Sequence, residues 1–220
     1  MSMDLRKRIS RLLSSGETEG LLALAREEPR TVRLLISRSY DMEEASSWRA
    51  IRAIGLIAGR MPQDRARGLI QRVLWMMREE SGTNPRSGPD ILGEVLRANP
   101  DPFADVLPVV ISFHEEEFLR AGALRAMARV GEVRPDLTAA FAPVAEVHLE
   151  DPDPSVRGAA LMALAPLGRE HCLQVLAKAG DEETFLFFDG DGLRPVSVSE
   201  AALGAARRMG CRGAGASWKK

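Results

Sequence analysis

Residues 151–168 read DPDPSVRGAALMALAPLG, and this stretch decides the fold class of the chain. A turn rich in aspartate and proline leads into a segment whose apolar residues recur at helical spacing around Leu164. The same segment carries small residues that let another helix pack closely against it, namely Ala159, Ala160 and Ala163. The stretch therefore predicts the second helix of a packed helix pair.

The same pattern recurs along the chain. When Leu164 is the anchor, the segment LRAGALRAMARVG at 119–131 superposes without a gap and places Met127 on that anchor. Weaker copies are centred on Ile54 and Leu92. Anchors at positions 54, 92, 127 and 164 are 38, 35 and 37 residues apart, close to the length of one helix pair in repeat proteins. A fifth copy, VSEAALGAARRMG, has Ala206 as its anchor.

These segments resemble the short HEAT-like repeats named after the phycobilisome lyases, and the chain is similar to uncharacterised bacterial HEAT-repeat proteins. The resemblance implies an all-α, right-handed α-α superhelix of about five helix pairs. It implies no lyase activity, because a shared fold does not carry a function with it. We expect one domain over 1–210 with an atypical N-terminal cap at 1–42, followed by a flexible tail at 211–220 that contains Trp218.

A β-hairpin is expected within the last repeat. Two short β-prone stretches, Thr184–Phe188 and Leu193–Val198, flank Asp189-Gly190-Asp191-Gly192. Asp-Gly steps supply the positive φ angles that tight hairpin turns require. We therefore expect a hairpin insertion over 184–198, with an irregular loop as the alternative.

Periodicity and helix breakers place the helices. The expected helices are 3–14, 18–27, 29–39, 43–59, 62–80, 87–98, 102–114, 115–131, 135–149, 154–168, 170–179 and 199–209.

Composition excludes several classes of protein. The net charge of −1 lacks the basic excess of a duplex-binding protein, so we expect no nucleic-acid partner. No apolar run approaches 18 residues and no signal-peptide core is present, which predicts a cytoplasmic protein without a membrane span. Cys172 and Cys211 are isolated in sequence, so reduced thiols are the simpler expectation than a disulfide.

The segment from Leu74 to Val95 fits the repeat pattern least well and holds most of the candidate binding residues. Trp75, Glu79 and Glu80 end one expected helix, and Asp90 and Glu94 share a face of the next because they are four residues apart. Glu80, Asp90 and Glu94 form a hypothetical carboxylate cluster for a cation or a basic partner segment. In the structural alternative these acids solvate a helix end or pair with nearby arginines, Arg86 or Arg97.

Arg120 and Arg157 occupy equivalent positions in the two clearest repeats. Their functional interpretation is a ladder of arginines facing a ligand. The structural alternative is an arginine bonded to an acidic residue in the turns between repeats, such as Asp151 or Asp153.

The sequence favours binding over catalysis. Only one of the three histidines, His114, is followed by glutamate, whereas the HEAT-like deoxyhypusine hydroxylases need several such pairs for their di-iron centre. No nucleophile, phosphate-binding or dinucleotide motif is present, so we expect no catalytic residue, cofactor or metal. We expect a non-catalytic scaffold or adaptor that binds a protein partner on a concave surface lined by the second helices. The alternative is a metal- or small-ligand-binding enzyme that uses Glu80, Asp90 and Glu94.

Overall fold

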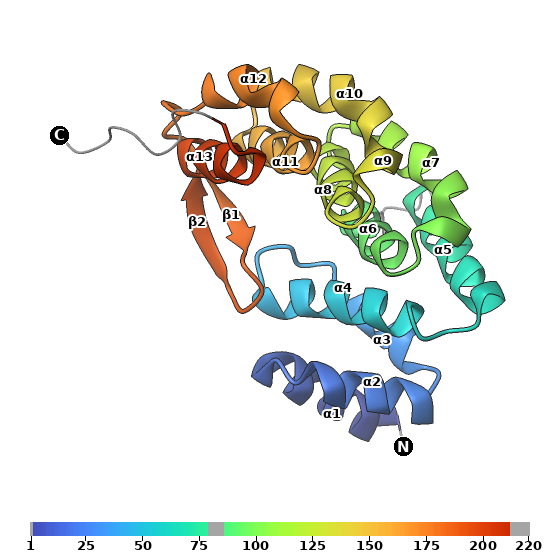
Figure 1. Ribbon diagram of the computed structural model, residues 1–220. Coiled ribbons are helices and arrows are strands. Elements are labelled where there is room, and N and C mark those ends of the chain that lie inside the picture. The colour runs from blue at the N-terminus through green and yellow to red at the C-terminus, as the bar shows by residue number, and fades with distance from the viewer. Residues whose placement is uncertain (1, 79–85, 212–220) are drawn as a thin grey trace. The chain divides into compact units, whose positions relative to one another are not determined.

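The computed structural model of the chain describes residues 2–78 and 86–211 (Figure 1). By its internal contacts the chain divides into two compact units. Unit 1 comprises Met1–Val110 with Phe188–Leu193, and unit 2 comprises Ile111–Phe187 with Arg194–Lys220.

Unit 1 is built from antiparallel helices. They are α1 (Ser2–Ser15), α2 (Thr18–Glu27), α3 (Thr31–Arg38), α4 (Ala45–Ala58), α5 (Gln63–Arg78) and α6 (Gly88–Ala98), followed by a 3-10 helix at Asp101–Val106 and the start of α7 (Leu107–Ser112). Residues 188–193 also belong to this unit, where Phe188 stacks on Trp48 of α4 with ring centroids 6.0 Å apart.

Unit 2 continues the series of helices and adds a two-stranded sheet. Its elements are α8 (Arg120–Gly131), α9 (Pro135–Thr138), α10 (Ala142–Val147), α11 (Pro154–Leu164), α12 (Cys172–Leu176), β1 (Thr184–Phe188), β2 (Leu193–Ser197) and α13 (Val198–Met209). Short 3-10 helices join several of them, at Phe113–Glu115, Ala139–Phe141, His148–Glu150 and Arg169–His171. The prediction of an all-α solenoid of helix pairs with a hairpin before the last helix is confirmed.

The repeat anchors fall where the sequence places them. Each is completely buried, with 0% of its surface exposed, and each lies on the second helix of a pair: Ile54 on α4, Leu92 on α6, Met127 on α8, Leu164 on α11 and Ala206 on α13. A residue at the centre of an apolar helical face is the most deeply buried when that face packs against neighbouring helices. The pattern found in the sequence is therefore the packing pattern of the core.

Second helices approach each other closely because small residues stand at their contacts. In unit 1, a Cβ atom added to Gly55 on α4 would lie 2.6 Å from the Glu94 Cβ and 2.7 Å from the Glu94 carbonyl oxygen on α6. In unit 2, α11 packs against both α8 and α13 (Figure 1). The small residues predicted to allow this packing are fully buried on α11, namely Ala159, Ala160 and Ala163.

Several helices of both kinds are shorter than predicted. The expected helix 102–114 is a 3-10 segment followed by α7, and the expected helix 135–149 is divided into α9, a 3-10 turn, α10 and a second 3-10 turn. Pro108 and Pro143 lie at these breaks, because each lacks the N–H donor that would bond to the carbonyl oxygen four residues earlier. The predicted helix 115–131 begins only at Arg120, and helix 154–168 ends at Leu164, two residues before Pro166.

The hairpin is present as predicted. The Asp189 carboxylate accepts hydrogen bonds from the backbone N–H groups of Asp191 and Gly192, both at 3.0 Å, and Gly190 has a φ of 120°. At the base of the hairpin Phe185 packs on α11, where a Cβ atom on Gly158 would lie 2.3 Å from the Phe185 ring. The hairpin is therefore anchored in unit 2 by an aromatic ring against a glycine.

The expectation of reduced thiols is wrong. Cys172 at the start of α12 and Cys211 after α13 form a disulfide, with their Cα atoms 5.8 Å apart. Helices α12 and α13 pack against each other, which brings together two cysteines that are 39 residues apart in sequence. Sequence spacing alone carries no information about that contact.

Within the described ranges, no helix is both long and apolar enough to cross a membrane.

Replacing Gly55 by alanine is expected to lower the free energy of unfolding by about 1 to 3 kcal/mol, because the added methyl group meets the α6 backbone, which cannot move aside cheaply. Gly68 on α5 is the matched control, since a Cβ atom there meets nothing within 4 Å. Gly68→Ala is expected to raise stability by up to about 1 kcal/mol through helix propensity. Urea denaturation of both variants tests this, and equal effects of the two would contradict the close approach.

The disulfide predicts a measurable loss of stability on its removal. The double variant Cys172→Ser/Cys211→Ser opens a loop of 39 residues, which the chain-entropy model equates with about 4 kcal/mol. The control is wild-type protein denatured with and without reductant, which is expected to show the same difference. Mass mapping of unreduced peptides that fails to find Cys172 linked to Cys211 would refute the pairing.

Candidate binding surface

The predicted acidic residues do not form an exposed cluster in the described residues. Asp90 and Glu94 on α6 are both buried, and the backbone of Glu94 lies against Gly55. Glu79 and Glu80 lie outside the described residues. Among the residues that the structure does describe, no group of three or more His, Cys, Asp or Glu side chains is arranged to hold a metal ion.

Arg120 is held by the segment before α8 and by the turn before α11. Its Nε–H donates to the carbonyl oxygen of His114 at 2.9 Å, and its Nη1 donates to the Asp151 carboxylate at 3.2 Å. Asp151 is buried, so this ion pair lies largely out of water. The geometry matches the structural alternative, in which an arginine bonds to an acid in a turn between repeats.

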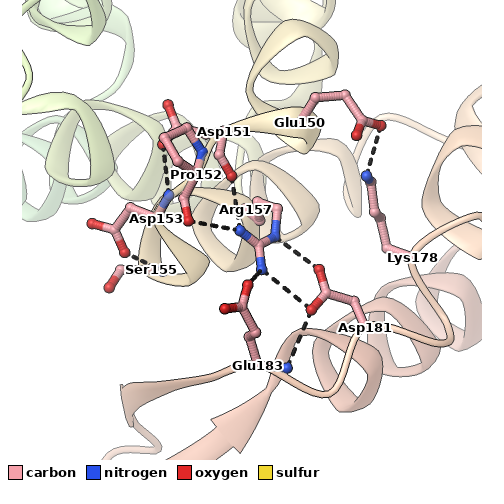
Figure 2. Close-up of polar contacts among 9 residues, drawn as sticks. All are labelled: Glu150, Asp151, Pro152, Asp153, Ser155, Arg157, Lys178, Asp181 and Glu183. Atoms are coloured by element: carbon pink, nitrogen blue, oxygen red, sulfur yellow. Dashed lines mark hydrogen bonds and ion pairs between the residues drawn. The ribbon is translucent and has the colours of Figure 1, made fainter.

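Arg157 on α11 is the centre of a larger polar network (Figure 2). Its Nε donates to Asp181 Oδ2 at 2.8 Å, and its Nη2 donates to Asp181 Oδ1 at 3.2 Å and to Glu183 Oε2. Its Nη1 donates to the carbonyl oxygens of Asp151 at 2.8 Å and Pro152 at 3.0 Å. A guanidinium has five N–H donors. All of them are occupied, so Arg157 has no donor left for a ligand.

Electrostatics fix the charge state of this network. Burial by itself would lower the pKa of Arg157, but hydrogen bonds to Asp181 and Glu183 outweigh it and raise that pKa. Burial by itself would raise the pKa of Asp181, but the bonds from Arg157 hold it below the ordinary aspartate range. Arg157 therefore joins the turn before α11 to the segment that leads into β1, as a fully ionised pair.

A histidine pair forms a second network that sequence analysis did not find. His114 Nδ1 and His148 Nε2 are 3.0 Å apart, and His148 Nδ1 lies 3.5 Å from the Asp151 carboxylate. Burial, followed by the nearby charges of His114 and Arg120, lowers the pKa of His148 below its usual value. The two rings therefore share one hydrogen bond with at least one ring neutral. No sequence signal indicated this pairing, because the two histidines are 34 residues apart.

Second helices present few accessible side chains. On α6 every residue from Gly88 to Leu96 is buried, and most of α8 and α11 is buried as well. Several large apolar side chains are instead exposed on first helices, notably Trp75 on α5 at 60%, Val147 on α10 at 73% and Leu173 on α12 at 83%. The surface available to a partner in the described residues therefore includes the first helices.

Trp75 belongs to an ordered stripe on α5. Arg65, Gly68, Arg72 and Trp75 are separated by three, four and three residues, which places them on one face of the helix. All four are exposed to solvent. We call these four residues the α5 stripe. Of the sequence-predicted binding residues, only Trp75 lies on it.

Several solved structures are similar to this chain in fold. An engineered protein solved by the Northeast Structural Genomics Consortium is 15% identical with a TM-score of 0.52, over 94% of this chain and 96% of that chain. The archaeal HEAT-like repeats protein from Thermococcus onnurineus NA1 is 15% identical with a TM-score of 0.44, over 95% and 80% of the two chains. A designed armadillo repeat protein is 16% identical with a TM-score of 0.47, over 93% and 91%. No family model and no curated protein matches the chain.

The Arg157 network predicts a structural cost for its loss. Arg157→Met is expected to lower the free energy of unfolding by about 2 to 4 kcal/mol, because Asp181 and two turn carbonyls lose their donors. Arg194→Met is the control, since the Arg194 side chain is 46% exposed against 8% for Arg157, and its bond to Glu200 is worth at most about 1 kcal/mol. Equal unfolding midpoints for the two variants in denaturant would contradict this assignment.

Proposed function

We propose that this chain is a non-catalytic protein-binding scaffold whose partner contacts the first helices, with α5 as the principal contact. The observation that carries the proposal is Trp75, a tryptophan that is 60% exposed within a stripe that also presents two arginines. Tryptophan and arginine are the residue types that most often dominate the binding energy of protein interfaces.

The fold supports this proposal without specifying a partner. Stacked helix pairs offer extended surfaces that repeat proteins use to bind other proteins. A concave contact face lined by second helices stays a prediction. The accessible side chains favour the first helices instead, because nearly all of α6 and most of α8 and α11 are buried.

The partner class that the chain supports best is protein. A net charge of −1 offers little electrostatic attraction for a nucleic acid. The expectation of a cytoplasmic location rested on the lack of a long apolar run and of a signal-peptide core, and it stays a prediction. The Cys172–Cys211 disulfide does not favour it, because structural disulfides persist mainly in oxidising compartments.

The alternative of an enzyme built on Glu80, Asp90 and Glu94 gains no support from the described part of that cluster. Glu80 is outside the described residues, and the other two carboxylates are buried on α6 rather than facing solvent. Metal content of the purified protein tests the alternative directly. Stoichiometric iron, zinc or manganese would favour it over the scaffold.

The scaffold proposal predicts that one exposed side chain controls partner capture. Affinity purification from the source organism, followed by mass spectrometry, is expected to recover a protein with the wild type and to lose it with Trp75→Ala. Leu186→Ala is the matched control, because Leu186 is an exposed apolar residue on β1 and lies outside the first helices. Both variants are expected to keep the wild-type circular dichroism spectrum and melting temperature.

Recovery of no specific protein with the wild type would count against the scaffold function. Recovery of the same protein with the wild type and Trp75→Ala would leave the function standing and move the contact away from α5.

A further inference from the structure

The arginines of the α5 stripe have a different environment from the other arginines described above. Arg65 and Arg72 make no hydrogen bond or ion pair within residues 2–78 and 86–211. Arg67, on another face of the same helix, donates to Asp105 at 3.0 Å and 3.2 Å and to the Pro102 carbonyl at 3.0 Å. Arg67 is thus used within the fold, whereas Arg65 and Arg72 have no acidic partner among the described residues.

The charge of the face that carries the α5 stripe is positive after its single acid is counted. Asp64 is exposed beside Arg65, so the two arginines Arg65 and Arg72 leave a net charge of +1 on this face. Arginine binds carboxylates through paired N–H groups and loses little water in doing so. The exposed face therefore favours a ligand with carboxylates.

Gly68 shows how closely a ligand can approach. A Cβ atom on Gly68 would meet nothing within 4 Å, so no neighbour in the fold requires a glycine there. Glycine nevertheless costs about 1 kcal/mol relative to alanine in the middle of an exposed helix. Between two arginines it leaves bare backbone against which another backbone can pack. At Gly55 the same residue type serves such an approach inside the fold.

The intervals between the residues of the α5 stripe match the intervals between side chains on a second helix. Arg65 and Arg72 are seven residues apart, as are Gly68 and Trp75. At a rise of 1.5 Å per residue each pair spans about 10 Å, which equals the distance between residues seven apart on a partner helix. Carboxylates at that interval can meet both arginines while an apolar residue contacts the Trp75 ring.

We propose that the α5 stripe binds an acidic amphipathic helix of a partner protein, with carboxylates on Arg65 and Arg72, backbone against Gly68 and an apolar side chain on Trp75. This inference rests on the proposed scaffold function and names the partner's chemistry. A nucleic acid fits the stripe less well, because its phosphates require a longer basic track than one helix face of this nearly neutral chain provides.

A defined probe tests the inference on the full chain. The probe is a fluorescein-labelled helical peptide that repeats Glu-Leu-Glu-Glu-Leu-Ala-Ala over about three heptads, measured by fluorescence anisotropy. We expect saturable binding that weakens with added salt. A peptide with glutamine in place of glutamate is expected to bind at least about tenfold more weakly, because it lacks the charges that pair with arginine.

Three variants place the binding on the stripe. Arg65→Glu/Arg72→Glu is expected to abolish peptide binding. Arg33→Glu/Arg38→Glu makes the same change in net charge on exposed residues of α3, so it controls for the long-range electrostatic effect, and we expect it to change the peptide affinity by no more than about twofold. Gly68→Gln adds bulk without charge in open space, so it is expected to keep or slightly raise the melting temperature and to weaken peptide binding at least about fivefold.

Several outcomes would overturn the inference. One is a lack of binding at about 1 mM peptide, and another is equal binding of the glutamate and glutamine peptides. A third is peptide binding that is unchanged by Arg65→Glu/Arg72→Glu or by Gly68→Gln. The last is tighter binding of a DNA duplex than of the acidic peptide. If the peptide fails while affinity purification still recovers a Trp75-dependent protein, the acidic-helix inference is wrong and the scaffold function stands. If neither the peptide nor any host protein binds, both fail.

Discussion

The close approach of helix backbones is the constraint on which the rest of the structure depends. A helix pair of this size cannot bury an apolar face alone, so second helices pack against each other within each unit. Glycine and alanine at the contacts make that possible, as Gly55 does for α4 and α6 and as the alanines of α11 do in unit 2. Low aromatic content follows from the same constraint, because large side chains would hold the helices apart.

Close packing of apolar helices leaves backbone carbonyl groups in the turns between them that need hydrogen-bond donors. The structure solves this with arginines placed at the start of second helices. Arg120 and Arg157 reach into turns and bond to carbonyl oxygens as well as to carboxylates. Arg157 also holds the segment that leads into β1, so the inserted hairpin is tied to the repeat that precedes it. Because the side chain is buried, its bonds carry more weight than those of arginines in water.

The same residue type has the opposite environment on α5. There the arginines lie in water beside an exposed tryptophan, with a glycine between them that the fold does not require. Residues at interaction surfaces differ from other surface residues in this way: they contribute little to the stability of the isolated chain and contribute to binding when a partner covers them. Burial, rather than residue identity, separates the arginines that build this protein from those we assign to its partner.

How far the sequence predicts this protein depends on whether each feature is local. Helix pairs, the five repeat anchors and the hairpin are encoded by short-range periodicity and turn chemistry, and the structure contains all of them. The tertiary structure alone decided which cysteines and histidines meet, because Cys172 and Cys211, and likewise His114 and His148, are separated by about one repeat and meet only through packing. It also decided that Glu94 is buried while Trp75 is exposed. Periodicity fixes which residues share a helical face, but only the neighbouring helices determine whether that face meets protein or water.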